Sequence, residues 1–152
     1  MEKPAAVDAV GVRQVIATSR EAEKKGLTII TGTQRRHQRD YLETYRKIAS
    51  GAIGEIRAAK AWWLQSHVWF HTREEGWSDM EYMLRNWNNF SWLSGDHFLD
   101  THIHNIDVVN WFIGQNPQSA IGCGGRARRL TGDQYDFFSV DFEYGNGVSS
   151  HS

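Results

Sequence analysis

Residues 92–111 contain the side chains in this sequence that are best suited to chemistry. If a helix begins near Phe98, then Asp100, His104 and Asp107 are spaced by four and three residues and share one helix face. A carboxylate one turn before an imidazole can orient the ring and stabilise its protonated form, and imidazole titrates closest to neutral pH. The spacing therefore indicates an acid/base pair formed by Asp100 and His104.

Two other interpretations of the same residues stay open. Asp and His near a helix start can cap the first turn and complement the macrodipole, which would make His104 a half-buried structural residue. Asp100, His104 and Asp107 could instead supply three metal ligands from one face, as a metal-dependent hydrolase would need. His102 lies about 200° from His104 around a helix, so these two residues cannot bind one ion together.

The elements that must position this helix begin with a helix and a strand. An apolar stripe predicts a helix over residues 7–25, which ends at Gly26, and the β-branched run at residues 27–31 is typical of a buried parallel strand. A second helix is predicted over residues 39–49, followed by a strand over residues 55–64. Such a helix–strand order is typical of an αβ repeat.

The last third of the sequence predicts β structure. Gly114 ends the central helix, strands are predicted over residues 119–129 and 136–144, and Asn146-Gly147 predicts a type I′ hairpin turn. The sequence ends about five residues after this turn, which is about the length of one average strand. We therefore expect a sheet that is incomplete.

A glycine-rich segment resembles a nucleotide-binding motif by chance. Residues 122–127 match G-x-G-x-x-A, but that motif binds pyrophosphate only between a strand and the N-terminus of a helix. No helix signal follows Ala127. We interpret these glycines as a strand bulge or as a close approach between backbones.

The composition limits the classes of partner. The 152 residues suffice for one ordinary domain, and 17 basic against 18 acidic residues give a net charge of −1, which disfavours nucleic acid and anionic membranes. Cys123 is the single cysteine, so an internal disulfide is excluded. We expect a cytoplasmic location by default, unless an export signal precedes Met1.

Aromatic and basic residues suggest a substrate surface. Most of the seven Trp residues are expected in cores or interfaces, but Trp92 and its neighbours could form a wall that packs against the C–H face of a sugar. The basic cluster at residues 35–39 is either a solvated loop or an anion or substrate contact, with Arg35 as the candidate. A non-catalytic, Trp-rich module that binds saccharide or protein is the alternative function.

Four motifs in order resemble one family. Residues 2–4 read Glu-Lys-Pro, residues 34–36 read Gln-Arg-Arg ahead of Tyr41, and residues 51–56 read Gly-Ala-Ile-Gly-Glu-Ile. The most specific match is Asp-x-x-x-His-x-x-Asp at residues 100–107. Together these motifs resemble the C-terminal part of the Gfo/Idh/MocA family, the oxidoreductases typified by glucose-fructose oxidoreductase and inositol dehydrogenase.

The resemblance implies a chemistry for specific residues. It implies a Rossmann domain that binds NAD or NADP, followed by a domain that binds a sugar or polyol and often forms a homo-oligomer through its sheet. Lys3 would contact both the nicotinamide region and a substrate hydroxyl, while Glu2 and Pro4 shape the turn that faces the cofactor. Asp100 would be the pocket carboxylate and His104 the proton acceptor.

The same resemblance predicts an α/β (α+β) chain in two parts. Residues 1–33 would be the αβ remnant of a Rossmann domain, and residues 34–152 a largely antiparallel, truncated sheet domain with helices on one face. No glycine-rich turn precedes Met1 in this sequence. We therefore expect a fragment of a dehydrogenase that is inactive alone, and that self-associates through the apolar face of the helix at residues 7–25.

Overall fold

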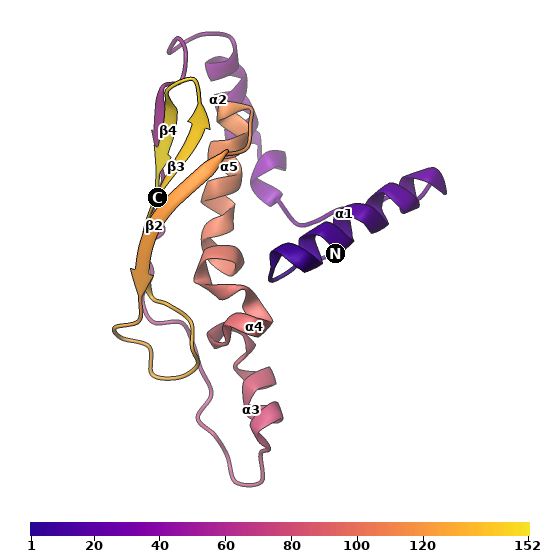
Figure 1. Cartoon of the computed structure of the whole chain (residues 1–152), viewed down its shortest axis with the longest axis vertical. Coiled ribbons are helices and arrows are strands. Elements are labelled where there is room, and N and C mark those ends of the chain that lie inside the picture. Colours follow the sequence, from indigo (N-terminus) through magenta and orange to yellow (C-terminus); the bar gives the residue numbers. More distant parts are fainter. The chain divides into compact units, whose positions relative to one another are not determined.

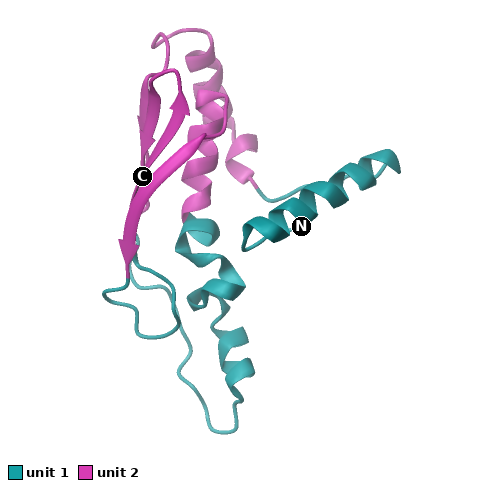
Figure 2. Cartoon of the chain, in the orientation of Figure 1, with its two compact units in different colours: residues 1–32, 65–101, 126–136 teal, residues 33–64, 102–125, 137–152 magenta.

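The computed structural model describes residues 1–152, and the chain divides into two compact units (Figure 2). Each unit is assembled from three segments that are distant in sequence. Unit 1 comprises Met1–Gly32, Gln65–Thr101 and Arg126–Asp136, and unit 2 comprises Thr33–Leu64, His102–Gly125 and Phe137–Ser152. The first break lies near the boundary that we predict after residue 33, while the assignment of the two domains stays a prediction.

Unit 2 contains a four-stranded sheet with the order β1-β4-β3-β2 (Figure 1). The strands are β1 (Ala58–Lys60), β2 (Ser119–Gly125), β3 (Phe137–Gly145) and β4 (Val148–His151). β2 pairs with β3 and β3 with β4 in antiparallel fashion, whereas β1 pairs with β4 in parallel. The mixed helix–sheet fold and its largely antiparallel sheet are confirmed.

The strand predicted over residues 55–64 is shorter than expected. Only Ala58–Lys60 are in β1, and their partners are Ser149–His151. A strand extends only where a neighbour supplies hydrogen bonds, and β4 has four residues. The hairpin prediction is confirmed, because Asn146 and Gly147 have φ values of 53° and 72°, the positive pair that a type I′ turn requires.

Two helices of unit 2, α2 (Arg39–Ala49) and α5 (Ile103–Ile113), lie along one face of its sheet (Figure 1). α2 has the predicted bounds, and Gly114 ends α5 in the left-handed conformation, as predicted. The Tyr45 and Trp111 rings stack at 4.8 Å between the two helices. The Tyr45 ring also meets the Phe112 ring edge-on, at 5.5 Å, so aromatic side chains join α2 to α5.

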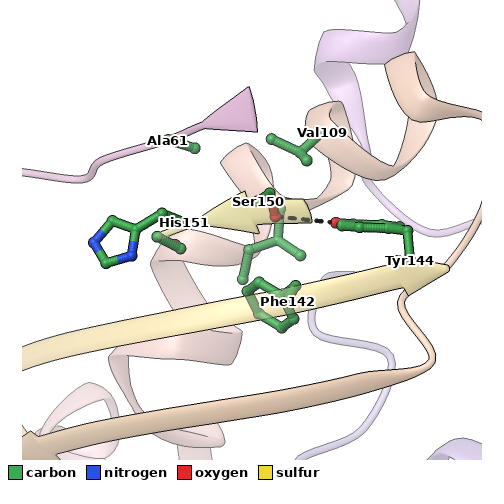
Figure 3. Close-up of a pocket in the computed structure, with 8 residues that line it drawn as sticks. Ala61, Val109, Phe142, Tyr144, Ser150 and His151 are labelled. Carbon is green, nitrogen blue, oxygen red and sulfur yellow. Dashed lines mark hydrogen bonds between the residues drawn. The ribbon is translucent and has the colours of Figure 1, made fainter. Parts of the chain in front are cut away.

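The core of unit 2 lies between α5 and the sheet. Tyr144 is almost fully buried, and its hydroxyl donates to Asn110 Oδ1 at 2.7 Å and lies 3.3 Å from Ser150 Oγ (Figure 3). Ile106 and Val109 of α5 meet Phe142 beside it, and the space among them has no room for a water molecule. The hollow in Figure 3 is a packed core and offers no space for a ligand.

The central helix differs from the prediction at its start. Phe98–His102 form a π-helical turn, and α-helical geometry begins only at Ile103. In a π-helix the hydrogen bonds run from i to i+5, so the i, i+4 spacing that places Asp100 over His104 does not apply across this turn. Single π-helical turns of this kind occur frequently at functional sites.

Unit 1 contains α1 (Ala9–Lys24), α3 (Asp79–Arg85) and the short α4 (Ser91–Ser94). α1 confirms the first predicted helix, with Asp8 as its N-cap. The most buried side chains of unit 1 are polar, which is possible only because they bond to each other and to backbone groups. They are Asn86, Asn88, Asn89, Ser94 and Gln134. None of the helices is long and apolar enough to cross a lipid bilayer.

The strand predicted at residues 27–31 is wrong. These residues have no regular structure, and Ile30 is 68% exposed. The reason is that no strand of this chain pairs with them, so the apolar run has no ladder to join. Val10, Val12 and Ile16 of α1 are also exposed, at 56%, 39% and 46%, and the self-association that we expect from this helix stays a prediction.

The glycines at residues 122–125 are part of strand β2, and no helix follows them. A Cβ atom at Gly122 would lie 2.9 Å from the Ser139 carbonyl oxygen, and one at Gly125 would lie 2.6 Å from the Phe137 ring. The expectation of a close backbone approach is therefore confirmed. This segment is not a dinucleotide-binding turn.

Gly132 is the tightest glycine of unit 1, and we expect Gly132→Ala to destabilise the fold strongly. Its φ is +75°, and a Cβ atom would lie 1.7 Å from the Asn89 carbonyl oxygen, which accepts a hydrogen bond from the Asp133 N–H at 3.0 Å. Backbone strain and overpacking together should lower the free energy of unfolding by about 2–5 kcal/mol in urea titrations.

Gly76→Ala is the matched control, because Gly76 also has a positive φ, of +86°, but no atom lies near its Cβ direction. This control should cost only about 1–2 kcal/mol, from backbone strain alone. Equal losses in Gly132→Ala and Gly76→Ala would contradict the close contact with Asn89.

Candidate functional site

The first part of the candidate site is an ion pair inside unit 1. Lys3 Nζ donates to Asp100 Oδ1 at 2.9 Å and also to the Asp100 backbone carbonyl, which lies in the π-helical turn. Both side chains are largely buried, with exposed fractions of 26% and 17%. A lysine has three N–H donors, so one donor remains for another acceptor. The structure thus brings together two residues that lie 97 positions apart.

A second carboxyl group, that of Asp96, and the imidazole of His97 lie near this ion pair. Burial raises the pKa of the Asp96 carboxyl, although the backbone N–H groups of Tyr135 and His97 and the charge of Arg129 act against it. Burial, together with the charge of Arg129, lowers the pKa of His97, while Asp96 and Asp100 oppose this shift. His97 is therefore a largely neutral imidazole at neutral pH. Neither Asp96 nor His97 was predicted as a site residue from the sequence.

Arg129 and Asp136 belong to the loop at residues 126–136 of unit 1, in which the Tyr135 N–H donates to Asp96 Oδ2 at 3.2 Å. Burial lowers the pKa of the Arg129 guanidinium. Burial acts to raise the pKa of Asp136, but hydrogen bonds from the N–H groups of Arg128, Ala127 and Arg129, at 2.6–2.9 Å, outweigh it and lower that pKa. Ionised Asp136 therefore stabilises the loop fully when the pH is above the pKa of an ordinary Asp. This contribution is lost as the pH falls through the lowered pKa of Asp136.

The second part of the candidate site is in unit 2, around His104 in the first turn of α5. The Trp63 ring lies 6.2 Å from the His104 ring, centroid to centroid. Arg35 lies over the same Trp63 ring, with Cζ 5.6 Å from its centroid. Trp63 therefore links the predicted substrate residue Arg35 to the predicted proton acceptor His104.

Asn105 is a member of this cluster that the sequence analysis did not identify. Its amide nitrogen donates to the Trp62 carbonyl oxygen at 2.7 Å, and its amide oxygen accepts a hydrogen bond from Arg35 Nη1. Asn105 therefore connects the segment after β1 to the Arg35 side chain. The sequence shows that Asn105 is adjacent to His104, but only the structure shows that Asn105 contacts Arg35 and Trp62.

Asp107 and His102 have structural partners in unit 2. Arg36 binds Asp107 in a bidentate manner, with Nη2 2.8 Å from Oδ1 and Nε 2.9 Å from Oδ2. His102 is buried, and its Nε2 is hydrogen-bonded to Ser152 Oγ. No group of three or more His, Cys, Asp or Glu side chains is placed to hold a metal ion. The pairing of Asp107 with a guanidinium disfavours the metal-ligand interpretation.

The remaining predicted residues lie in unit 1. Glu2 is exposed and Pro4 is half-buried, next to Lys3 in sequence. Trp92 is 51% exposed on α4. Among the predicted site residues of unit 1, Lys3 and Asp100 are the pair that the structure brings into contact. The roles predicted for Glu2, Pro4 and Trp92 stay predictions.

The residues of this chain fit one end of a nicotinamide dinucleotide. The free donor of Lys3 suits the oxygen of a carboxamide or a hydroxyl. The N-terminus of α1 is not open to a pyrophosphate, because the Asp8 carboxylate already caps it and accepts from the Gly11 N–H at 2.7 Å. The fit is therefore to the nicotinamide end, with Glu2, Lys3 and Pro4 as the candidate contacts.

Asp107→Asn should destabilise unit 2. The substitution removes the charge from a partly buried bidentate pair, and such charge-assisted bonds contribute about 1.5–3 kcal/mol. Urea titration should show a loss of about this size. Glu43→Gln is the control, since the Glu43–Arg46 pair is exposed and such pairs contribute about 0–1 kcal/mol. A smaller loss for Asp107→Asn than for Glu43→Gln would contradict a structural role for Asp107.

Comparison with a family model gives an extended match. The model described as the GFO/IDH/MocA C-terminal domain matches residues 41–152. The match covers both strands of the hairpin, all of α5 and most of the candidate site, but it begins after Lys3 and Arg35.

Two curated relatives match over nearly the whole chain. The 2,7-anhydro-N-acetylneuraminate hydratase of Escherichia coli K12 is 26% identical over 149 residues, which cover 96% of this chain and 36% of the relative. An uncharacterized oxidoreductase of Streptococcus pneumoniae serotype 4 is 24% identical over 148 residues, which cover 95% of this chain and 36% of the relative. The chain thus spans about 36% of the length of these relatives.

Solved structures share the fold of this chain. Aldose-aldose oxidoreductase from Caulobacter crescentus, complexed with glycerol, has a TM-score of 0.70 at 18% identity. Myo-inositol 2-dehydrogenase from Lactobacillus plantarum has a TM-score of 0.68 at 21% identity. Each match covers 99% of this chain and 41% of the other, and at these identities it shows the fold alone.

Proposed function

Because this chain belongs to the GFO/IDH/MocA family, we propose that it forms the substrate-binding part of an NAD- or NADP-dependent oxidoreductase. The proposed reaction transfers a hydride between the nicotinamide and a secondary hydroxyl of a sugar or cyclitol. The solved relatives that are named for an aldose and for myo-inositol support this substrate class. A homo-oligomer formed through the sheet of unit 2 is part of the same proposal.

The observation that carries the proposal is the ion pair between Lys3 and Asp100. The oxidation of an alcohol develops negative charge on the hydroxyl oxygen, and an ammonium with one free donor can stabilise that charge. Asp100 fixes the position of the ammonium, since its carboxylate and its carbonyl hold the other two donors. Asp100 lies in a π-helical turn, a feature that is frequent at functional sites.

We assign the proton transfer to His104. As the C–H bond breaks, the hydroxyl proton must move to a base, and an imidazole is suited to accept it at neutral pH. The nicotinamide, when bound, supplies the hydride acceptor. Trp63 supports the His104 ring from one side, which would restrict its orientation toward the substrate. Lys3 would stabilise the negative charge on the oxygen while His104 takes the proton, and departure of the hydride leaves a neutral carbonyl.

The alternative is a module that binds saccharide without catalysis. Trp62, Trp69 and Trp92 are each at least 50% exposed, and exposed indole rings can pack against sugar C–H groups. This alternative requires no cofactor. It therefore predicts sugar-dependent changes in Trp fluorescence that NAD and NADP do not affect.

The test uses a joined protein, in which this chain is fused to a domain that contains a glycine-rich strand–turn–helix motif. We expect reduction of NAD or NADP, seen as absorbance at the nicotinamide band, with at least one of myo-inositol, D-glucose or a related polyol. The chain alone should show no turnover. Sugar binding without any cofactor reduction in the joined protein would favour the non-catalytic module.

A further inference from the structure

We propose that Arg35 binds a carboxylate of the substrate, so that the physiological ligand is a sugar acid. The inference rests on the proposed function, because it names the substrate class of the same site. It depends on the charge and the contacts of one half-buried guanidinium in unit 2.

The guanidinium of Arg35 is held by two aromatic rings. Its Cζ lies 5.6 Å from the centroid of the Tyr41 ring and 5.6 Å from that of Trp63. Ring faces attract a cation and also remove part of its hydration. The planar group is therefore fixed in position, with part of its water shell already removed, before any ligand binds.

Arg35 has no counter-ion in this structure. Its one hydrogen bond is donated by Nη1 to the Asn105 amide oxygen, and no Asp or Glu oxygen lies within 4.0 Å of it. The neighbouring Arg36 is different, since the Asp107 carboxylate neutralises it in a bidentate pair. Arg35 thus keeps a positive charge that no carboxylate of this chain neutralises.

Asn105 positions Arg35 without neutralising it. Because the Asn105 amide nitrogen donates to the Trp62 carbonyl oxygen at 2.7 Å, its oxygen must face Arg35. A neutral amide leaves the guanidinium charge intact. A guanidinium has five N–H donors, so Arg35 still has an edge with the parallel geometry that a carboxylate prefers.

The place of Arg35 explains why such an anion would belong to the substrate. Trp63 contacts both Arg35 and the proposed base His104. A ligand with a carboxylate at Arg35 would therefore extend along the Trp63 ring toward His104, where a secondary hydroxyl would react.

A carboxylate fits this site better than a phosphate does. Arg36 is committed to Asp107, so Arg35 supplies one uncompensated positive charge, which matches the single charge of a carboxylate. A phosphate monoester carries a charge of about −1.5 to −2 at neutral pH and would require a second cation.

The test measures charge selectivity in the 152-residue chain by Trp fluorescence. The probes are D-glucuronate and D-galacturonate, each compared with its neutral amide. A charge-assisted bond predicts that the acid binds about 10- to 100-fold more tightly than its amide. Arg35→Gln should bring this ratio to about 1, and Arg35→Lys should give an intermediate value, because it keeps the charge but loses the fork.

The matched control is Arg46→Gln, which removes the same charge from an exposed side chain of α2 outside the basic cluster. It should leave the acid-to-amide ratio unchanged. A change in fold alone would weaken binding of acid and amide equally, so the ratio separates recognition of charge from a structural role of Arg35.

Three outcomes would overturn the proposal. They are a ratio near 1 for both pairs in the unmodified chain, a ratio that Arg35→Gln does not change, or tighter Arg35-dependent binding of glucose 6-phosphate than of either acid. Cofactor reduction with a neutral polyol together with a ratio near 1 would sink this inference while the proposed function stands. Arg35-dependent binding of the acids without any cofactor reduction in the joined protein would support this inference and contradict the proposed oxidoreductase function.

Discussion

Replacing His104 by Ala in the joined protein should lower turnover by about 10²- to 10⁴-fold, the usual contribution of a general base. The affinity for the cofactor should change little, because His104 is assigned to the substrate proton and makes no proposed contact with the dinucleotide. Steady-state kcat with a reactive polyol and the Kd of the reduced cofactor are the two measurements.

The control for this prediction is Asp107→Asn. The Asp107 carboxylate pairs with Arg36, so Asp107→Asn should reduce the stability of the protein. Asp107→Asn should lower turnover less than His104→Ala does. Near-parental turnover in His104→Ala, together with complete loss in Asp107→Asn, would show that the roles on this helix are assigned wrongly.

Lys3→Ala should lower kcat and raise KM together, because the one free donor of Lys3 would bind the substrate oxygen in the ground state and more strongly as negative charge develops on it. Loss of one preorganised donor to a developing oxyanion costs about 10²- to 10³-fold in kcat. The substitution also leaves Asp100 without its cation, a largely buried carboxylate whose pair lies at 2.9 Å. Part of the effect therefore comes from Asp100 alone.

The double variant Lys3→Ala/Asp100→Asn separates these two contributions. If the pair acts as a unit, the double variant should be no worse than Lys3→Ala, because the uncompensated carboxylate is gone. A Lys3→Ala variant with unchanged kcat and KM would contradict the proposed role of the ion pair.

Local sequence signals predicted the elements whose boundaries depend on the chain itself. α2 has the predicted bounds, and the Asn146-Gly147 turn and the Gly114 stop follow from backbone preferences of single residues. The inner residues of β3 also alternate with exposed ones, as a strand with one covered face requires. These features need no information from distant segments.

Features that depend on distant segments were less predictable. The apolar run at residues 27–31 has the composition of a strand, but a strand requires a partner and none is available here. The π-helical turn at Phe98–His102 was not predicted either, although the Lys3 ammonium on the Asp100 carbonyl accompanies it. The periodicity of one segment carries no information about such a contact.

The candidate site shows the same division. Asp100 and His104 were identified from residue type and spacing, and Lys3 only through the resemblance to a family. Asn105 and Trp63 were not predicted as site residues, because their importance lies in contacts with Arg35 and His104 that join segments far apart in sequence.

Isotope transfer tests the central claim most directly. The joined protein would be given a polyol that carries deuterium on the carbon to be oxidised, and the reduced cofactor would be analysed by mass spectrometry. If this chain binds the substrate of a hydride-transfer reaction, each reduced nicotinamide will carry one deuterium from that carbon. Reduced cofactor without the label, or product formed while the label appears in water, would contradict the account.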